Sequence, residues 1–110
     1  MSAEMIKIIT YVPHDAAEKL RQAVGEAGAG RLGEYSFCSF SSSGTGRFLA
    51  SNNAHPTIGK PGQAEEVAEE RVEVVCERSV AKPVVTALKS VHPYEEVPVE
   101  IIALINEDDL

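Results

Sequence analysis

Short apolar runs alternate with amphipathic stretches along this chain, and their periodicity predicts a series of strands and helices. Residues 5–12 (MIKIITYV) are rich in β-branched side chains and predict a strand that is apolar on both faces, as in the centre of a sheet. Residues 16–27 repeat apolar side chains at helical spacing, and Asp15 with Glu18 forms a capping-box pattern at the start of this helix. Gly28 suits the left-handed position that ends a helix.

Glycine, serine and aromatic residues are concentrated between residues 28 and 62. Residues 34–40 (EYSFCSF) alternate in the manner of a strand, and residues 47–50 (RFLA) predict a short second strand. Between them, SSSGTG at residues 41–46 predicts a hairpin turn or a wide loop. We expect a long loop from residue 51 to residue 62, and loops of this length usually serve a function.

From residue 65 onward, the chain repeats the order strand, helix, strand. Residues 65–77 predict a half-exposed strand, and a helix is expected over residues 80–91, with Ser79 as its N-cap and His92-Pro93 as its stop. Residues 97–105 (VPVEIIALI) predict the last strand, before an acidic tail. The complete order predicts an α+β, ferredoxin-like βαββαβ fold, which is an antiparallel sheet with two helices on one face.

Length and charge restrict the class of protein. A chain of 110 residues fits one domain spanning residues 1–110. The formal net charge of −7 argues against nucleic acid and anionic membrane surfaces as partners, because both require clustered lysine and arginine. The sequence shows neither a membrane-spanning run nor a signal-peptide pattern, so a cytoplasmic location is expected. Cys38 and Cys76 lack a CxxC spacing, and we expect both to be reduced and buried.

Two glycine-rich motifs have ordinary interpretations that we favour. The letters of GAGRLG, residues 28–33, match a dinucleotide loop, but here a helix precedes the motif and a strand follows it, which is the reverse of the required order. SSSGTG offers backbone groups for an anion, although a solvated hairpin tip is the favoured interpretation. The sequence has no HExxH, no GxSxG and no recognisable nucleophile–base spacing, so we expect no enzymatic activity.

His92-Pro93-Tyr94-Glu95-Glu96 is the stretch with the most chemical potential. Imidazole and carboxylate are ligands of zinc and copper(II), so the sequence predicts a candidate divalent-metal site. Its candidate ligands are His92, Glu95, Glu96, His55 and Cys38. Because one histidine and one same-side carboxylate are too few for tight binding, the remaining ligands would have to come from His55, from Cys38 or from another subunit. The alternative is a helix stop with a packed Tyr94 and solvated glutamates.

Several motifs resemble a known family. AGAGRLGEYSFCSFSSSGTGRF, HPTIGKPG and VAEERVEVV resemble the YqfO-type domain, which occurs alone and as an insertion in Nif-three-like di-metal proteins. HPYEEVPVEIIAL is similar both to that family and to the CutA divalent-cation-tolerance proteins. The resemblance implies a stand-alone CutA/PII-like fold that forms oligomers, since the CutA and PII relatives are trimers. The di-metal ligands of the Nif-three-like proteins lie in other domains and are not implied for this chain.

These patterns together predict a non-enzymatic, oligomeric binding or regulatory protein that senses a divalent metal or a small ligand. The alternative is an accessory subunit or domain partner of a Nif-three-like di-metal enzyme. An oligomer is expected, because one helix layer cannot hide all the apolar side chains of the sheet, and the resemblance to the CutA and PII proteins favours a homotrimer over a dimer. The side chains in question are Phe37, Phe40, Val97, Val99 and Ile101.

Overall fold

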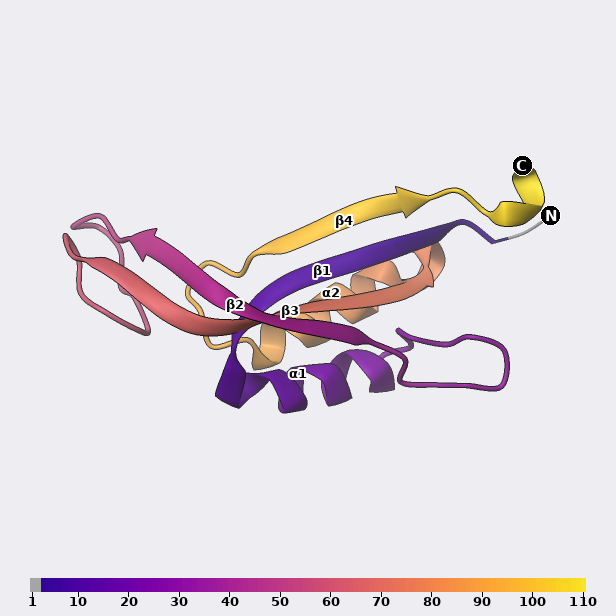
Figure 1. The fold of residues 1–110 in the computed structure, drawn as a ribbon, viewed down its shortest axis with the longest axis horizontal. Helices are drawn as coiled ribbons and strands as arrows, with labels where there is room; N and C mark the ends of the chain where they lie inside the picture. The colour runs from indigo at the N-terminus through magenta and orange to yellow at the C-terminus, as the bar shows by residue number, and fades with distance from the viewer. Residues whose placement is uncertain (1–2) are drawn as a thin grey trace.

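The computed structural model describes residues 3–110 and confirms the predicted ferredoxin-like fold (Figure 1). Its elements are β1 (Met5–Pro13), α1 (His14–Glu26), β2 (Phe40–Leu49), β3 (Ala64–Glu77), α2 (Ala81–Val91) and β4 (Val99–Leu104), with short 3-10 turns at Arg78–Val80 and Glu107–Asp109. Within the described residues, the strands form one antiparallel sheet in the order β2-β3-β1-β4. The apolar strand β1 is therefore central, as its two-sided pattern predicts.

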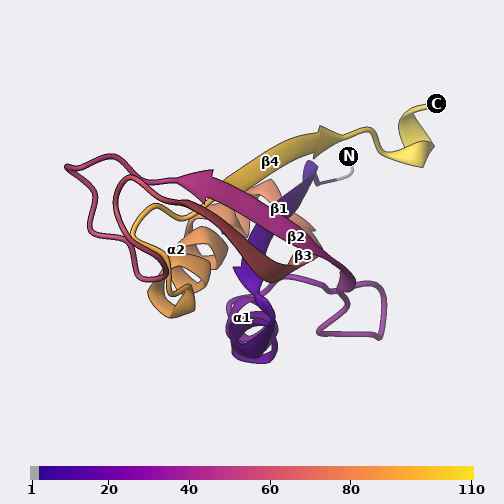
Figure 2. The same ribbon diagram turned by 60° about the vertical axis from the view of Figure 1, so that its left-hand side comes forward.

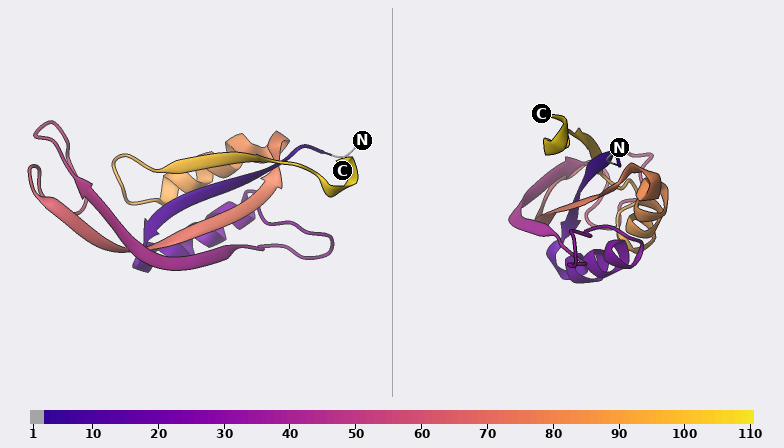
Figure 3. Two further views of the ribbon diagram at one scale, coloured as in Figure 1. Left: turned by 45° about the horizontal axis from the view of Figure 1, so that its top comes forward. Right: turned by 90° about the vertical axis from the view of Figure 1, so that its right-hand side faces the viewer.

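Both helices lie on the same face of the sheet, as Figure 2 and the end-on view in Figure 3 show. The core forms between this face and the helices, because β1 and β3 direct alternate apolar side chains toward α1 and α2. The most deeply buried side chains of this core, from the strands and from both helices, are Ile8, Val12, Leu20, Val24, Val72, Val84 and Leu88.

Within residues 3–110, neither helix is long and apolar enough to cross a membrane.

The helix ends agree only in part with the predicted caps. Helix α1 begins at His14, directly after Pro13, so Asp15 lies in the first turn and makes no cap. Gly28 does end the helix: its φ is +115°, and its N–H donates to the Gly25 carbonyl at 3.1 Å. Ser79 is not a cap either, because the 3-10 turn delays α2 until Ala81. His92 ends α2 as predicted.

The prediction of a hairpin turn or wide loop within residues 34–50 is wrong. Residues 34–39 belong to an exposed loop, and SSSGTG lies inside the single strand β2. Pairing with β3 explains the difference, because Gly44 opposes Glu69 and Gly46 opposes Val67 in a continuous ladder. Tertiary strand pairing thus overrides the local turn preference of glycine and serine.

Both cysteines are free, but Cys38 is exposed, contrary to expectation, whereas Cys76 is buried as predicted.

Strands β2 and β3 extend beyond the rest of the sheet. The β1–β3 ladder ends at Pro13 opposite Glu69, whereas the β2–β3 ladder continues to Leu49 opposite Ala64. Residues 45–49 and 64–68 therefore form a two-stranded ribbon, which we call the arm, and its tip is the loop of residues 50–63 (left in Figure 1). The molecule is elongated, 51 × 24 × 23 Å. Because a lone two-stranded ribbon is marginally stable in water, other segments must hold the arm.

Candidate functional site

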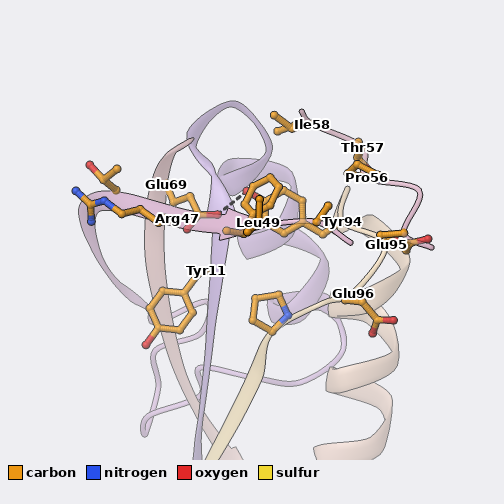
Figure 4. Close-up of a pocket in the computed structure, with 16 residues that line it drawn as sticks. Tyr11, Arg47, Leu49, Pro56, Thr57, Ile58, Glu69, Tyr94, Glu95 and Glu96 are labelled. Carbon is orange, nitrogen blue, oxygen red and sulfur yellow. Dashed lines mark hydrogen bonds between the residues drawn. The ribbon is translucent and has the colours of Figure 1, made fainter. Parts of the chain in front are cut away.

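A pocket of about 600 Å³ lies where the arm, its loop and the α2–β4 connection meet (Figure 4). The arm contributes Thr45, Gly46, Arg47, Phe48 and Leu49, and the loop contributes Ala50, Ala54, Pro56, Thr57 and Ile58. The remaining lining residues are Tyr11, Glu69, Tyr94, Glu95, Glu96 and Pro98. The volume is within the range of small-molecule sites, and most of the lining is apolar.

Glu69 and Tyr94 meet in the middle of this pocket (Figure 4). The Tyr94 hydroxyl donates a hydrogen bond to Glu69 Oε2. Burial, together with the hydrogen bond to Glu69 and its negative charge, raises the pKa of Tyr94 well above its usual range. The hydroxyl therefore remains protonated and acts as a donor. The Phe48 ring meets the Tyr94 ring edge-on, with centroids 6.4 Å apart, which links the arm to the α2–β4 connection.

His92 fixes the position of Tyr94. The imidazole is 7% exposed, and its Nε2 lies 2.7 Å from the Tyr11 carbonyl oxygen, which can only accept a hydrogen bond. Nδ1 accepts from the Tyr94 N–H at 3.2 Å, so the neutral Nε2–H tautomer satisfies both ring nitrogens. Burial lowers the pKa of His92, which favours this neutral form. His92 is thus a positioning residue beneath the pocket.

Two hydrogen bonds tie the loop of residues 50–63 to the α2–β4 connection. The His55 N–H donates to both carboxylate oxygens of Glu95, at 3.0 and 3.2 Å. The Thr57 hydroxyl donates to the Pro93 carbonyl at 2.7 Å. Figure 2 shows the two segments beside each other. These ties give the arm support that its single strand pair lacks, and they close one side of the pocket.

The structure does not bring the five predicted metal ligands together. Both ring nitrogens of His92 are engaged in hydrogen bonds, and Glu95 binds the backbone of His55. Glu96 is exposed at the pocket rim. Cys38 lies in the exposed loop before β2, toward the other end of the molecule from the pocket (Figure 1). Within residues 3–110, no group of three or more histidine, cysteine or acidic side chains is arranged to hold a metal ion.

Sequence patterns identified only part of the pocket, because they named Glu95 and Glu96 as candidate ligands but not Glu69. Glu69 belongs to the run EEVAEE, where two adjacent pairs of glutamates have the appearance of a solvated strand face. Its environment depends on the register that places it next to Gly46 and on the turn that delivers Tyr94. The length of the loop after Ala50, for which a function was expected, is the one sequence signal that pointed to this part of the chain.

Comparison with known proteins shows that the chain is similar to a segment of longer, NIF3-related proteins. No family model matches the chain. It is 48% identical over 104 residues to the GTP cyclohydrolase 1 type 2 homolog of Mycobacterium bovis, a match that covers 94% of this chain and 27% of the relative. A Bacillus cereus protein related to NIF3 superposes with a TM-score of 0.84 at 40% identity, covering 96% of this chain and 27% of that one. The chain thus spans about a quarter of the length of the curated relatives that it matches.

Solved structures of lower identity support the fold. The CutA1 protein of Ehrlichia chaffeensis has a TM-score of 0.69 at 13% identity and covers 99% of this chain and 89% of its own. GlnK of B. subtilis, solved as a complex with ATP, has a TM-score of 0.63 at 17% identity and covers 94% and 84%. The expected resemblance to NIF3-related proteins and to the CutA and PII-like fold is confirmed.

Proposed function

We propose that this chain, which matches a domain-sized segment of NIF3-related proteins, is a binding module that holds a small organic molecule in the pocket beside its arm. One observation supports this most directly. A mostly apolar pocket of about 600 Å³ contains a central hydrogen-bonded acid–phenol pair, Glu69 and Tyr94. Apolar walls with a few oriented polar groups are the usual composition of a small-molecule site.

The polar groups around the pocket have positions suited to binding rather than to chemistry. Glu95 holds the loop backbone, and His92 holds Tyr94 from below. The Tyr94 hydroxyl donates to Glu69, and its raised pKa makes it a poor proton shuttle near pH 7. We therefore assign these residues to ligand orientation. A metal ion is the less favoured ligand, because the predicted donors are separated.

The pocket function is tested by native mass spectrometry of the protein purified from cell extract. We expect a small organic molecule to remain bound to the wild type and to be lost from Leu49→Ala, whose side chain forms a pocket wall. Leu32→Ala is the matched control: Leu32 is 71% exposed in the loop before β2, and Leu49 is 67% exposed. Equal retention by the two variants, or no stabilising small molecule in a thermal-shift screen, would count against this function.

We also propose that the chain forms a homo-oligomer, with a trimer favoured over a dimer. Large apolar side chains remain exposed on both edge strands, with Phe40 on β2 at 66% and Ile101 on β4 at 54%. The loop before β2 adds Phe37, which is 48% exposed. Val97 and Val99 pack against the core and contribute less than predicted. Light scattering should give three times the monomer mass at micromolar concentration, and a monomer would contradict the assembly.

A second candidate function is that of a domain partner of a NIF3-related di-metal protein. The observation that favours it is the identity of 48% to a segment of longer proteins. In that case, adding the remaining part of such a relative should give a stable complex in size-exclusion chromatography. A small molecule bound by the isolated chain would favour the first function.

A further inference from the structure

We propose that the pocket takes an organic cation, a protonated amine or guanidinium carried on a flat apolar body. This inference rests on the proposed function and narrows it to one chemical class of ligand. It is drawn from the charges, the free hydrogen-bond acceptors and the aromatic surface that line the pocket.

The charge balance of the lining is negative. Glu69, Glu95 and Glu96 face a single cation among the described lining residues, Arg47. Arg47 is already paired, since its Nε donates to Glu66 at 3.3 Å, outside the pocket. Among residues 3–110, no lysine and no residue of either helix lines the pocket, so Arg47 is the single charged donor there for a phosphate. An anionic ligand would therefore meet like charge.

Glu69 supplies the acceptor at the centre. Glu69 is half-buried, and its Oε2 accepts a hydrogen bond from the Tyr94 hydroxyl. Its Oε1 accepts no hydrogen bond from the described residues. Oε1 lies over Gly46, where the missing side chain leaves room for the carboxylate. A donor group on a ligand can supply the hydrogen bond that Oε1 lacks. A charged donor gives the stronger hydrogen bond. Glu95 and Glu96 lie at the rim in Figure 4 and add to the attraction.

The surrounding surface suits an apolar body attached to that cation. Tyr94 and Phe48 present aromatic rings, and cations are attracted to such rings when they lie within roughly 6 Å of the centroid. The other walls are aliphatic, formed mainly by Leu49, Pro56 and Ile58. Leu49 is 67% exposed in the free chain, so an apolar ligand would remove its side chain from water.

The test is isothermal titration of the full chain with three probes of similar size: 2-phenylethylamine, 2-phenylethanol and 3-phenylpropionate. We expect the amine to bind about tenfold more tightly than the alcohol, because one charge-assisted hydrogen bond has about this effect on affinity. The carboxylate should not bind measurably. Glu69→Gln should weaken amine binding about tenfold. Glu34→Gln, which removes the same charge from the exposed loop before β2, should leave it unchanged.

A pair of glycine variants tests the geometry independently of charge. A Cβ at Gly46 would collide with the Glu69 carboxylate and displace it, whereas a Cβ at Gly44 meets nothing within 4 Å. We expect Gly46→Ala to weaken amine binding and Gly44→Ala to leave it intact, with both proteins folded by circular dichroism. Binding of 3-phenylpropionate as tight as that of the amine would overturn the ligand class and leave the pocket function standing. Amine binding that is absent, or unaffected by both Glu69→Gln and Gly46→Ala, would overturn the inference itself.

Discussion

The helix-covered part of the sheet and the arm are held by different physical means. In the covered part, apolar side chains from β1, β3 and both helices are almost fully buried, among them Ile8, Leu20 and Leu88. The arm has no helix beneath it and depends on one strand ladder, one aromatic contact and a few hydrogen bonds. The covered part therefore supplies the stability, whereas the arm can adjust around a ligand at low cost.

The largest expected effect comes from removing a core side chain. Leu88→Ala should lower the free energy of unfolding by about 2–5 kcal/mol, because it leaves a cavity between α2 and the sheet. Leu49→Ala in the arm should change it by less than about 0.5 kcal/mol, since that side chain is mostly exposed. Urea unfolding of both variants measures the contrast. Equal losses would show that the arm belongs to the stability core.

The next effect concerns His92, which lies where the two regions join. His92→Gln should lower the free energy of unfolding by about 1–3 kcal/mol at pH 7, because it disrupts the hydrogen bonds to the Tyr11 carbonyl and the Tyr94 N–H. Burial lowers the pKa of His92 in the folded chain, so below about pH 6.5 the unfolded chain takes up the proton first. The stability difference between wild type and His92→Gln should therefore shrink as the pH falls from 7 to 5.

His14 gives this pH experiment an internal contrast. Its Nδ1 lies 2.6 Å from Glu70 Oε2, a contact that His92→Gln leaves unchanged. Because His14 is present in both proteins, its contribution cancels in the difference. A difference that stays constant from pH 7 to pH 5 would show that the His92 imidazole carries no folding-linked proton.

The contrast between the two regions also explains what could be predicted from the sequence. Periodicity located β1, both helices and the buried face of β3, because the core imposes a repeating apolar pattern. The arm has no such pattern. Gly44 and Gly46 predicted a turn, yet they pair with β3 in mid-strand, since only the partner strand determines that register.

Most of the pocket could not be predicted either, because it depends on contacts between segments that are distant in the sequence. HPYEE was identified as the most chemical stretch, and three of its members, Tyr94, Glu95 and Glu96, do line the pocket. The predicted ligand His92 instead supports Tyr94 from the protein interior. Glu69 became recognisable only through a contact between residues 25 positions apart. Charge patterns along one segment do not reveal such a pairing.

A smaller effect is expected from Tyr94→Phe. The change removes the hydrogen bond to Glu69 and keeps the ring that packs on Phe48, so global stability should fall by only about 1 kcal/mol. Amide exchange should speed up over residues 45–49 and 64–68, while residues 72–76 keep the wild-type rate. Hydrogen-exchange mass spectrometry resolves these segments. Faster exchange throughout the sheet would mean that the arm does not open separately.

The most direct test of the central claim, that the arm and its pocket form the binding region, is hydrogen exchange with and without saturating 2-phenylethylamine. We expect the amine to slow exchange in residues 45–49, 64–69 and 93–98, which surround Glu69 and Tyr94. Residues 72–76 in the core and the exposed loop 31–36 should keep their rates. Protection that falls on loop 31–36, or an arm that exchanges equally with and without the amine, would contradict the claim.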